Sequence, residues 1–193
     1  MSGTRTLRAT GATLTVLGAV GLLAALALTV DRIRLLEDPS YIPSCDLSPV
    51  LSCGSVMSSE QASLLGFPNP ILGLVGFSVV VTLGVVLAAG VRLPAWMLTG
   101  LAVGSAAGAA FVHWLAFQSL YRIGALCPWC LVVWAVTVPI ALWAVLLAAD
   151  ASRSPHRLLR TAWEARLLLV ATWYLVVLVL ILIRFWDYWS TLL

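Results

Sequence analysis

Five long apolar stretches dominate this sequence and restrict what it can fold into. A helix needs about 20 predominantly apolar residues to cross the hydrocarbon core of a bilayer, and each stretch reaches that length. They cover residues 11–30, 71–91, 94–120, 128–149 and 166–186. The third is longer than a bilayer requires, so we expect it to tilt or to leave the membrane early. The pattern predicts an all-α integral membrane protein with five transmembrane helices.

Composition excludes several other classes of protein. Apolar residues make up 62% of the chain and charged residues 10%, against roughly half and a quarter in soluble domains. A soluble fold of 193 residues cannot bury so much apolar surface, whereas membrane lipid can accept it. There is no lysine, which excludes Schiff-base chemistry. The net charge of +3 comes from arginines at the ends of apolar runs, so we expect no nucleic-acid partner.

The arginines also predict the orientation of the chain in the membrane. Seven lie before the first stretch, between the second and third, or between the fourth and fifth, and four lie on the opposite side among acidic residues. Cytoplasmic segments carry the excess of positive charge. The N-terminus is therefore expected in the cytoplasm and the C-terminus outside. The seven are Arg5, Arg8, Arg92, Arg153, Arg157, Arg160 and Arg166.

The first apolar stretch has a second interpretation. Arg5 and Arg8, followed by an apolar run that contains Ala25-Leu26-Ala27, resemble a cleavable signal peptide. The run is longer than the usual signal core, so we expect it to be retained as a membrane span. In both cases the chain from residue 31 onward emerges outside.

Two connecting segments carry further predictions. From Ser55 to Leu65 the sequence reads as a short amphipathic helix, capped by Ser55 or Ser58 and ended by Gly66, which would lie over the mouth of the bundle. An ordinary interfacial connector explains this pattern equally well.

The expected organisation is a cytoplasmic N-terminus (1–10), a four-helix core (11–149) with an outer loop (31–70), a basic cytoplasmic connector forming a surface helix (150–165), and a fifth helix with an outer C-terminus (166–193).

The four cysteines all fall on the predicted outer side. Cys127 and Cys130 open the fourth span in the motif Cys127-Pro128-Trp129-Cys130. Proline is tolerated in the first helical turn, so Cys127 is expected at the cap and Cys130 at the third position, on the same helix face. The helix dipole and free backbone donors stabilise a thiolate there. This motif predicts a redox-active pair.

Cys45 and Cys53 enclose seven residues of the outer loop. Alone, such a pair is as readily a structural disulfide as a redox site, but next to the helix-start pair it favours a relay. We expect a partner thiolate to attack Cys45, the freed Cys53 to attack Cys127, and the deeper Cys130 to pass electrons to an acceptor in the membrane. A zinc site is the competing interpretation, but Cys45 and Cys53 are too far apart for a zinc knuckle, and we expect no metal.

These residues resemble a known family, the bacterial homologues of vitamin K epoxide reductase. The resemblance rests on the order of the two pairs, the loop pair first and the helix-start pair second, together with Ser59 and Asn69 before the second span. It covers residues 11–149. It implies a four-helix bundle around a quinone, either menaquinone or ubiquinone, in a bacterial inner membrane, with disulfide formation coupled to quinone reduction.

The resemblance also implies roles for particular residues. Asn69 matches an asparagine that hydrogen-bonds the quinone, and Trp134 occupies the position of an aromatic residue with the same role, usually tyrosine in the vertebrate enzymes. Ser59 matches a hydroxyl of the quinone pocket. Many members of the family carry a fused thioredoxin-like domain. Since this chain stops at Leu193, we expect a separate, exported DsbA-like or thioredoxin-like partner.

Two other functions compete with that of a quinone-dependent thiol oxidase. A membrane scaffold with static disulfides would use the same cysteines without turnover. A transporter is disfavoured because the spans lack paired charges and inverted repeats. His113, inside the third span, is interpreted as packing or pocket lining, with a proton relay as the alternative. Gly100, Gly104 and Gly108 are predicted to allow close helix packing.

Overall fold

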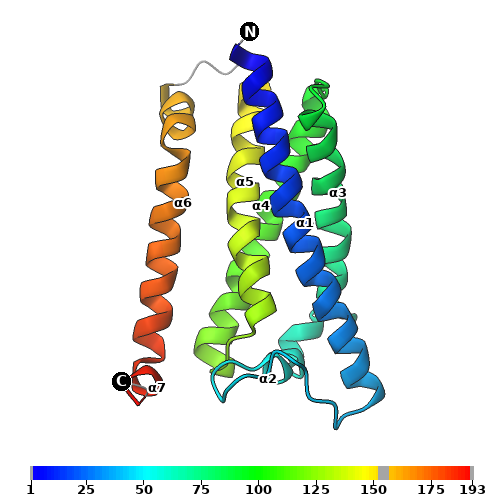
Figure 1. Ribbon diagram of the computed structural model, residues 1–193, viewed down its shortest axis with the longest axis vertical. Helices are drawn as coiled ribbons and strands as arrows, with labels where there is room; N and C mark the ends of the chain where they lie inside the picture. Colours follow the sequence, from blue (N-terminus) through cyan, green and yellow to red (C-terminus); the bar gives the residue numbers. More distant parts are fainter. Residues whose placement is uncertain (1, 152–156, 192–193) are drawn as a thin grey trace.

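The computed structural model describes residues 2–151 and 157–191 as a bundle of long helices (Figure 1). In these residues five helices are long and apolar enough to cross a membrane, and no strand forms. The predicted all-α membrane fold is therefore confirmed. The long helices are α1 (Ser2–Glu37), α3 (Pro70–Ala88), α4 (Ala95–Gln118), α5 (Pro128–Ala151) and α6 (Arg157–Arg184). The short ones are α2 (Cys53–Met57), the 3₁₀ helix η1 (Glu60–Ser63), the π-helix η2 (Ser119–Ile123) and α7 (Trp186–Ser190).

Successive long helices run in opposite directions, which brings distant segments together at one end of the bundle. The end of α1, the start of α3, the end of α4 and the start of α5 meet at the lower end in Figure 1, where α2 also lies. We call this the cysteine end, because residues 45, 53, 127 and 130 all belong to it. α1 packs on α3 and α5, and α4 packs on α5. α6 stands beside α5 at the margin of the bundle.

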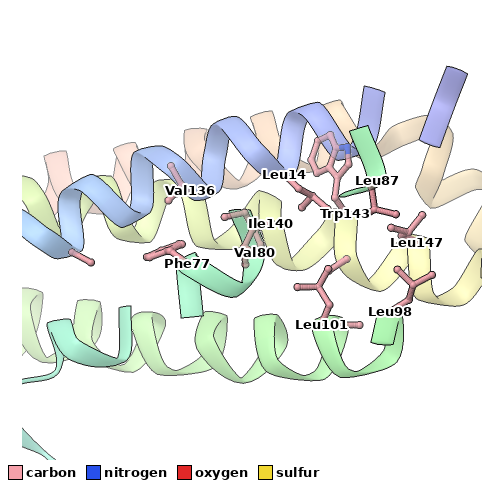
Figure 2. Packing of buried hydrophobic residues seen from close by; sticks show 13 residues of the cluster. Leu14, Phe77, Val80, Leu87, Leu98, Leu101, Val136, Ile140, Trp143 and Leu147 are labelled. Carbon is pink, nitrogen blue, oxygen red and sulfur yellow. The ribbon is translucent and has the colours of Figure 1, made fainter. Parts of the chain in front are cut away.

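The core lies between the first four long helices, away from the cysteine end. Leu14 of α1 and Leu87 of α3 are fully buried, and they pack in one cluster with Leu101 of α4 and with Ile140 and Trp143 of α5 (Figure 2). Membrane helices gain stability from such van der Waals packing and not from a difference in hydrophobicity, since lipid tails are as apolar as leucine. α5 is the most enclosed of the five spans and α6 the least.

Close helix packing through glycine occurs at a different place from the one predicted. A Cβ atom on Gly84 of α3 would lie 2.7 Å from Thr15 Oγ1 of α1, so glycine is what lets these two helices approach. A Cβ atom on Gly100 or Gly104 of α4 would meet nothing within 4 Å, and one on Gly108 only a methyl group at 3.8 Å. The prediction for Gly100, Gly104 and Gly108 is therefore wrong, because α3 and α4 contact each other little and these glycines face the space between them.

The connecting segments also differ from the predictions. The single helix expected over 55–65 is divided into α2 and η1, because Ser58 ends the first and Ser59 has an extended conformation. Its cap is Ser52, whose Oγ accepts the N–H of Ser55 at 3.1 Å, and not Ser55 or Ser58. Gly66, with φ of 83°, makes the turn that follows, as expected.

The connector over 150–165 is not a separate surface helix where the structure describes it. Residues 150–151 end α5 and residues 157–165 form the first turns of α6, while residues 152–156 lie outside the described part of the chain. α1 is likewise longer than the apolar stretch 11–30, because polar residues at both of its ends continue the helix until Asp38 and Pro39. Apolar periodicity marks the membrane-buried part of a helix and not its full length.

Candidate active site

A short backbone pairing fixes the loop that carries Cys45 and Cys53, called the redox loop below, against the start of α5. Leu51 and Leu126 form an isolated parallel bridge. The N–H of Ser52 donates to the carbonyl of Leu126 at 2.9 Å, and the N–H of Leu126 donates to the carbonyl of Val50 at 2.7 Å. The residues that follow, Cys53 and Cys127, are thereby held next to each other although 74 positions separate them.

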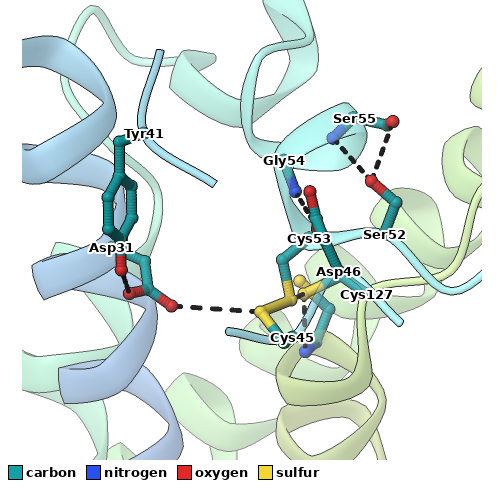
Figure 3. The surroundings of a disulfide bond; sticks show 10 residues. Asp31, Tyr41, Cys45, Asp46, Ser52, Cys53, Gly54, Ser55 and Cys127 are labelled. Atoms are coloured by element: carbon teal, nitrogen blue, oxygen red, sulfur yellow. Dashed lines mark hydrogen bonds between the residues drawn. A yellow bond between two sulfur atoms is a disulfide. The ribbon is translucent and has the colours of Figure 1, made fainter. Parts of the chain in front are cut away.

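Cys45, Cys53 and Cys127 form one connected group at this place (Figure 3), and the backbone N–H of Cys130 donates to Cys127 Sγ. Cys45 and Cys53 are joined by a disulfide, and Cys127 and Cys130 are free thiols. The Sγ atoms of Cys127 and Cys53 lie 3.2 Å apart. Cys45, Cys53 and Cys127 are all buried, at 6%, 0% and 1% exposure. A thiolate on Cys127 would therefore need little movement to attack the disulfide at Cys53, and a freed Cys53 would need little to attack Cys127.

The start of α5 has the geometry that the motif predicted. The carbonyl of Cys127 accepts the N–H of Leu131 at 3.0 Å, and its Sγ accepts the N–H of Cys130 at 3.3 Å. Hydrogen bonding from the Cys130 side chain lowers the pKa of the Cys127 thiol below its ordinary value. Desolvation opposes this shift, and the backbone N–H groups of Cys130 and Trp129 reinforce it. Cys127 is therefore prepared to react as a thiolate.

The redox loop is braced by an acidic side chain. Asp46 Oδ1 accepts the N–H of Gly54 at 2.8 Å, and a Cβ atom on Gly54 would lie 2.8 Å from Asp46 Oδ2. The ligand atoms of Cys45, Asp46 and Cys53 lie within 4.8 Å of one another, as the atoms of a metal site would. With both sulfurs bonded to each other, neither is a thiolate that could hold zinc.

A cavity of about 640 Å³ lies behind the cysteines, between α3, α4 and α5. This volume is within the range of about 300–1,000 Å³ for small-molecule sites. Its wall is mostly aliphatic and aromatic, and the glycines of α4 widen it. The wall residues with hydrogen-bonding or thiol side chains are Ser59, Gln61, Asn69, Trp96, Ser105, Gln118, Ser119, Cys127, Cys130, Trp134 and Thr137. The structure thus brings all three predicted quinone-binding residues and both cysteines of the α5 motif to one cavity.

Trp134 lies on the cavity wall with a hydrogen-bond donor that has no partner among the described residues. Its side chain is 7% exposed, and its indole N–H has no hydrogen-bond partner in the described part of the chain. Its ring meets the rings of His113 and Trp173 edge-on, at centroid distances of 5.6 and 5.4 Å. Trp173 in turn donates its indole N–H to His113 Nε2 at 3.0 Å. Through Trp173, helix α6 thereby contacts Trp134 of the cavity wall.

Asn69 and Ser59 have structural partners in addition to their places on the wall. Asn69 Nδ2 donates to the carbonyl of Gln61 at 2.7 Å and Oδ1 accepts the N–H of Leu64 at 3.2 Å, which ties η1 to the start of α3. Ser59 Oγ donates to the carbonyl of Val56 at 2.7 Å. One amide hydrogen of Asn69 remains for a ligand.

Two residues of this region were not predicted as functional. Gln118 Oε1 is buried with no partner among the described residues, on the cavity wall, and its polarity inside an apolar run was the signal. Asp31 is 7% exposed near the end of α1, with Oδ2 at 3.9 Å from Cys45 Sγ (Figure 3). An acidic residue at the end of a span normally faces water, so the sequence alone gives no sign that Asp31 is buried against the disulfide.

The cavity fits a quinone in its chemistry. A quinone ring needs an apolar slot with few donors for its two carbonyl oxygens, and the unpaired indole N–H of Trp134 is such a donor beside the free thiol of Cys130. A disulfide, two further thiols and an apolar cavity inside a bundle of membrane-spanning helices define a class, the membrane-embedded thiol–disulfide oxidoreductases.

A comparison with protein families identifies the family within that class. The model of the vitamin K epoxide reductase family matches residues 12–145, most of the chain, and the protein belongs to this family. Its members are oxidoreductases that couple disulfide chemistry to quinones in membranes and generally work with thioredoxin-like partners. A search of curated proteins gives no match.

Proposed function

We propose that this protein is a quinone-dependent thiol oxidase that generates disulfides outside the cytoplasm. It oxidises a DsbA-like or thioredoxin-like protein and passes the electrons to menaquinone or ubiquinone. The observation that carries the proposal is the 3.2 Å contact between Cys53 and Cys127, because it joins the loop disulfide to the pair on the cavity wall. The arginine distribution supports an orientation with the cysteine end outside.

The first exchange occurs at the loop pair. A partner thiolate attacks Cys45, which is slightly more exposed than Cys53, and Cys53 leaves as a thiolate. The second thiol of the partner then attacks its own mixed disulfide, so the partner leaves oxidised and Cys45 leaves as a thiolate. Two electrons have passed from the partner to Cys45 and Cys53. Because Cys45 is 6% exposed, the loop must open for this step.

The second exchange moves these electrons inward. The Cys53 thiolate attacks Cys127 of a Cys127–Cys130 disulfide, and Cys130 leaves as a thiolate on the cavity wall. Cys45 then attacks Cys53 and releases Cys127. The arrangement in the structure, with the loop pair oxidised and the inner pair reduced, corresponds to this stage.

The last step restores the inner disulfide. Its closure releases two electrons and two protons, and a bound quinone supplies the acceptor for both. Trp134 and the free amide hydrogen of Asn69 would orient the ring, while the apolar wall excludes water. Cys127, with its lowered pKa, is the thiolate held for exchange.

The test uses the whole chain purified in detergent. A reduced thioredoxin-like protein and a soluble naphthoquinone are added, and the absorbance of the quinone is followed. We expect reduction with the wild type and with Val75→Ala, an exposed position on α3 that serves as control, and loss with Cys45→Ala or Cys130→Ala. No reduction by a folded wild type with an intact loop disulfide would refute the oxidase and favour a scaffold with static disulfides.

A further inference from the structure

Cys45 lies beside the carboxylate of Asp31. Its Sγ is buried, and Asp31 Oδ2 lies 3.9 Å away, on the side opposite Cys53 in Figure 3. In the disulfide this sulfur carries no hydrogen, so the present contact is not a hydrogen bond to a thiol. Once Cys45 is reduced, its S–H can donate to that oxygen.

Asp31 is held in place by neighbours that leave its Oδ2 atom free. Tyr41 O–H donates to Oδ1 at 2.9 Å, and Arg34 donates to the Tyr41 oxygen at 3.3 Å. Within the described residues no cation lies within salt-bridge distance of the carboxylate. Among the described residues, the other carboxylate at the loop pair is Asp46, whose Oδ1 accepts the Gly54 N–H. In the described part of the chain, the sulfur of Cys45 is therefore the reactive group that contacts Oδ2.

Under the proposed function, Cys45 leaves as a thiolate in each turnover when the partner departs. This thiolate gains a proton to become a thiol, and the thiol must lose that proton when the sulfur attacks Cys53. A sulfur that is 6% exposed has little water to supply or accept that proton. A local group that exchanges one proton with Cys45 would remove this obstacle.

We infer that Asp31 is a catalytic acid–base that exchanges a proton with Cys45. Its carboxylate takes the proton of the Cys45 thiol as that sulfur attacks Cys53 and Cys127 leaves. The protonated Asp31 returns this proton to the Cys45 thiolate when the oxidised partner leaves. The carboxyl group ends each cycle as it began, and the electrons move only between sulfur atoms and the quinone.

The matched variants are Asp31→Asn, Asp31→Glu and Tyr41→Phe. Asparagine keeps the size of the side chain and an acceptor for Tyr41 but cannot carry a proton. Glutamate restores the carboxyl group. Tyr41→Phe removes the hydroxyl that donates to Asp31 and leaves the carboxyl group in place. If Asp31 only braces the loop, this variant should slow the reactions as much as Asp31→Asn does.

Two half-reactions are measured by rapid acid quench and thiol labelling. One is the reduction of Cys45–Cys53 by dithiothreitol, and the other is the reoxidation of the reduced protein by a soluble naphthoquinone. General acid–base catalysis contributes about 10²–10⁴-fold in enzymes, and thiol exchange is intrinsically fast. We therefore expect Asp31→Asn to slow both half-reactions about tenfold or more, Asp31→Glu to recover most of the rate, and Tyr41→Phe to have a smaller effect.

A variant that carries both Cys45→Ser and Cys53→Ser tests whether Asp31 acts only in the steps that involve Cys45. There the quinone oxidises only Cys127 and Cys130, and adding Asp31→Asn should leave the rate unchanged. Unchanged rates for Asp31→Asn in the full chain would overturn the inference. So would faster reduction, which would mean that the carboxylate only repels the Cys45 thiolate, or an equal loss in Tyr41→Phe. If the wild type reduces no quinone, the proposed function fails, while the dithiothreitol arm still tests Asp31 alone.

Discussion

Cys53 and Cys127 lie with their Sγ atoms 3.2 Å apart, and the bridge between Leu51 and Leu126 holds them there. If exchange passes through this contact, removing the other two cysteines should trap it. We expect the double variant Cys45→Ser, Cys130→Ser to form a Cys53–Cys127 disulfide in mild oxidant. Loss of two maleimide-reactive thiols, seen as a change in gel mobility, measures this.

The matched control leaves the other outer cysteine. Cys53→Ser, Cys130→Ser retains Cys45 and Cys127 but lacks the sulfur that lies 3.2 Å from Cys127, so it should crosslink more slowly. Equal crosslinking of the two variants would mean that the loop moves too freely for the 3.2 Å contact to direct exchange.

The thiolate of Cys127 should appear at lower pH than that of an ordinary cysteine. Its pKa is lowered mainly by the hydrogen bond from the Cys130 side chain, and a thiolate forms as pH rises through the pKa. Cys130→Ala removes that hydrogen bond, so we expect thiolate formation to move to higher pH. The far-ultraviolet absorbance of thiolate, taken as a difference from Cys127→Ser, measures the midpoint. A midpoint that stays or falls would contradict the assigned cause.

The sequence was sufficient for the spans and the cysteines but not for their surroundings. Five apolar runs and the Cys127-Pro128-Trp129-Cys130 motif depend on local chemistry, namely bilayer thickness and helix-start geometry, and both agree with the structure. The bridge of Leu51 to Leu126 and the burial of Asp31 depend on which chain segments meet at the cysteine end. Nothing local in the sequence records that meeting.

The glycines show the same limit of prediction from sequence. Spacing alone predicts a packing surface at Gly100, Gly104 and Gly108, whereas a neighbouring backbone crowds Gly11 of α1 and Gly84 of α3. A small residue permits either a close helix or an empty space. Only the position of the next helix decides between them, and α3 leaves α4 open to the cavity.

Substitutions at these glycines should separate folding from quinone binding. Gly84→Leu must push α1 away, and overpacking of this kind costs about 1–3 kcal/mol, so we expect a lower Tm in detergent. The Cβ atom added by Gly104→Leu would meet nothing within 4 Å, so the new side chain extends into the cavity. We expect a Tm near that of the wild type and a KM for the soluble quinone raised about tenfold, equivalent to about 1.4 kcal/mol. If instead Gly104→Leu unfolds the protein and leaves KM unchanged, the cavity assignment is wrong.

Trp134 and Trp173 should differ in effect although they touch. Trp134→Phe keeps an aromatic ring and removes the indole N–H that lacks a partner within the described chain. A hydrogen bond is worth about 0.5–1.5 kcal/mol, so we expect KM for the soluble quinone to rise about threefold to tenfold, with Tm unchanged. Trp173→Phe removes the donor to His113 instead. Interhelical hydrogen bonds in membranes average about 0.6 kcal/mol, so this variant should lower Tm slightly and change KM little. If instead Trp173→Phe raised KM and Trp134→Phe lowered Tm, the quinone would lie nearer to α6 than to the wall that carries Cys130.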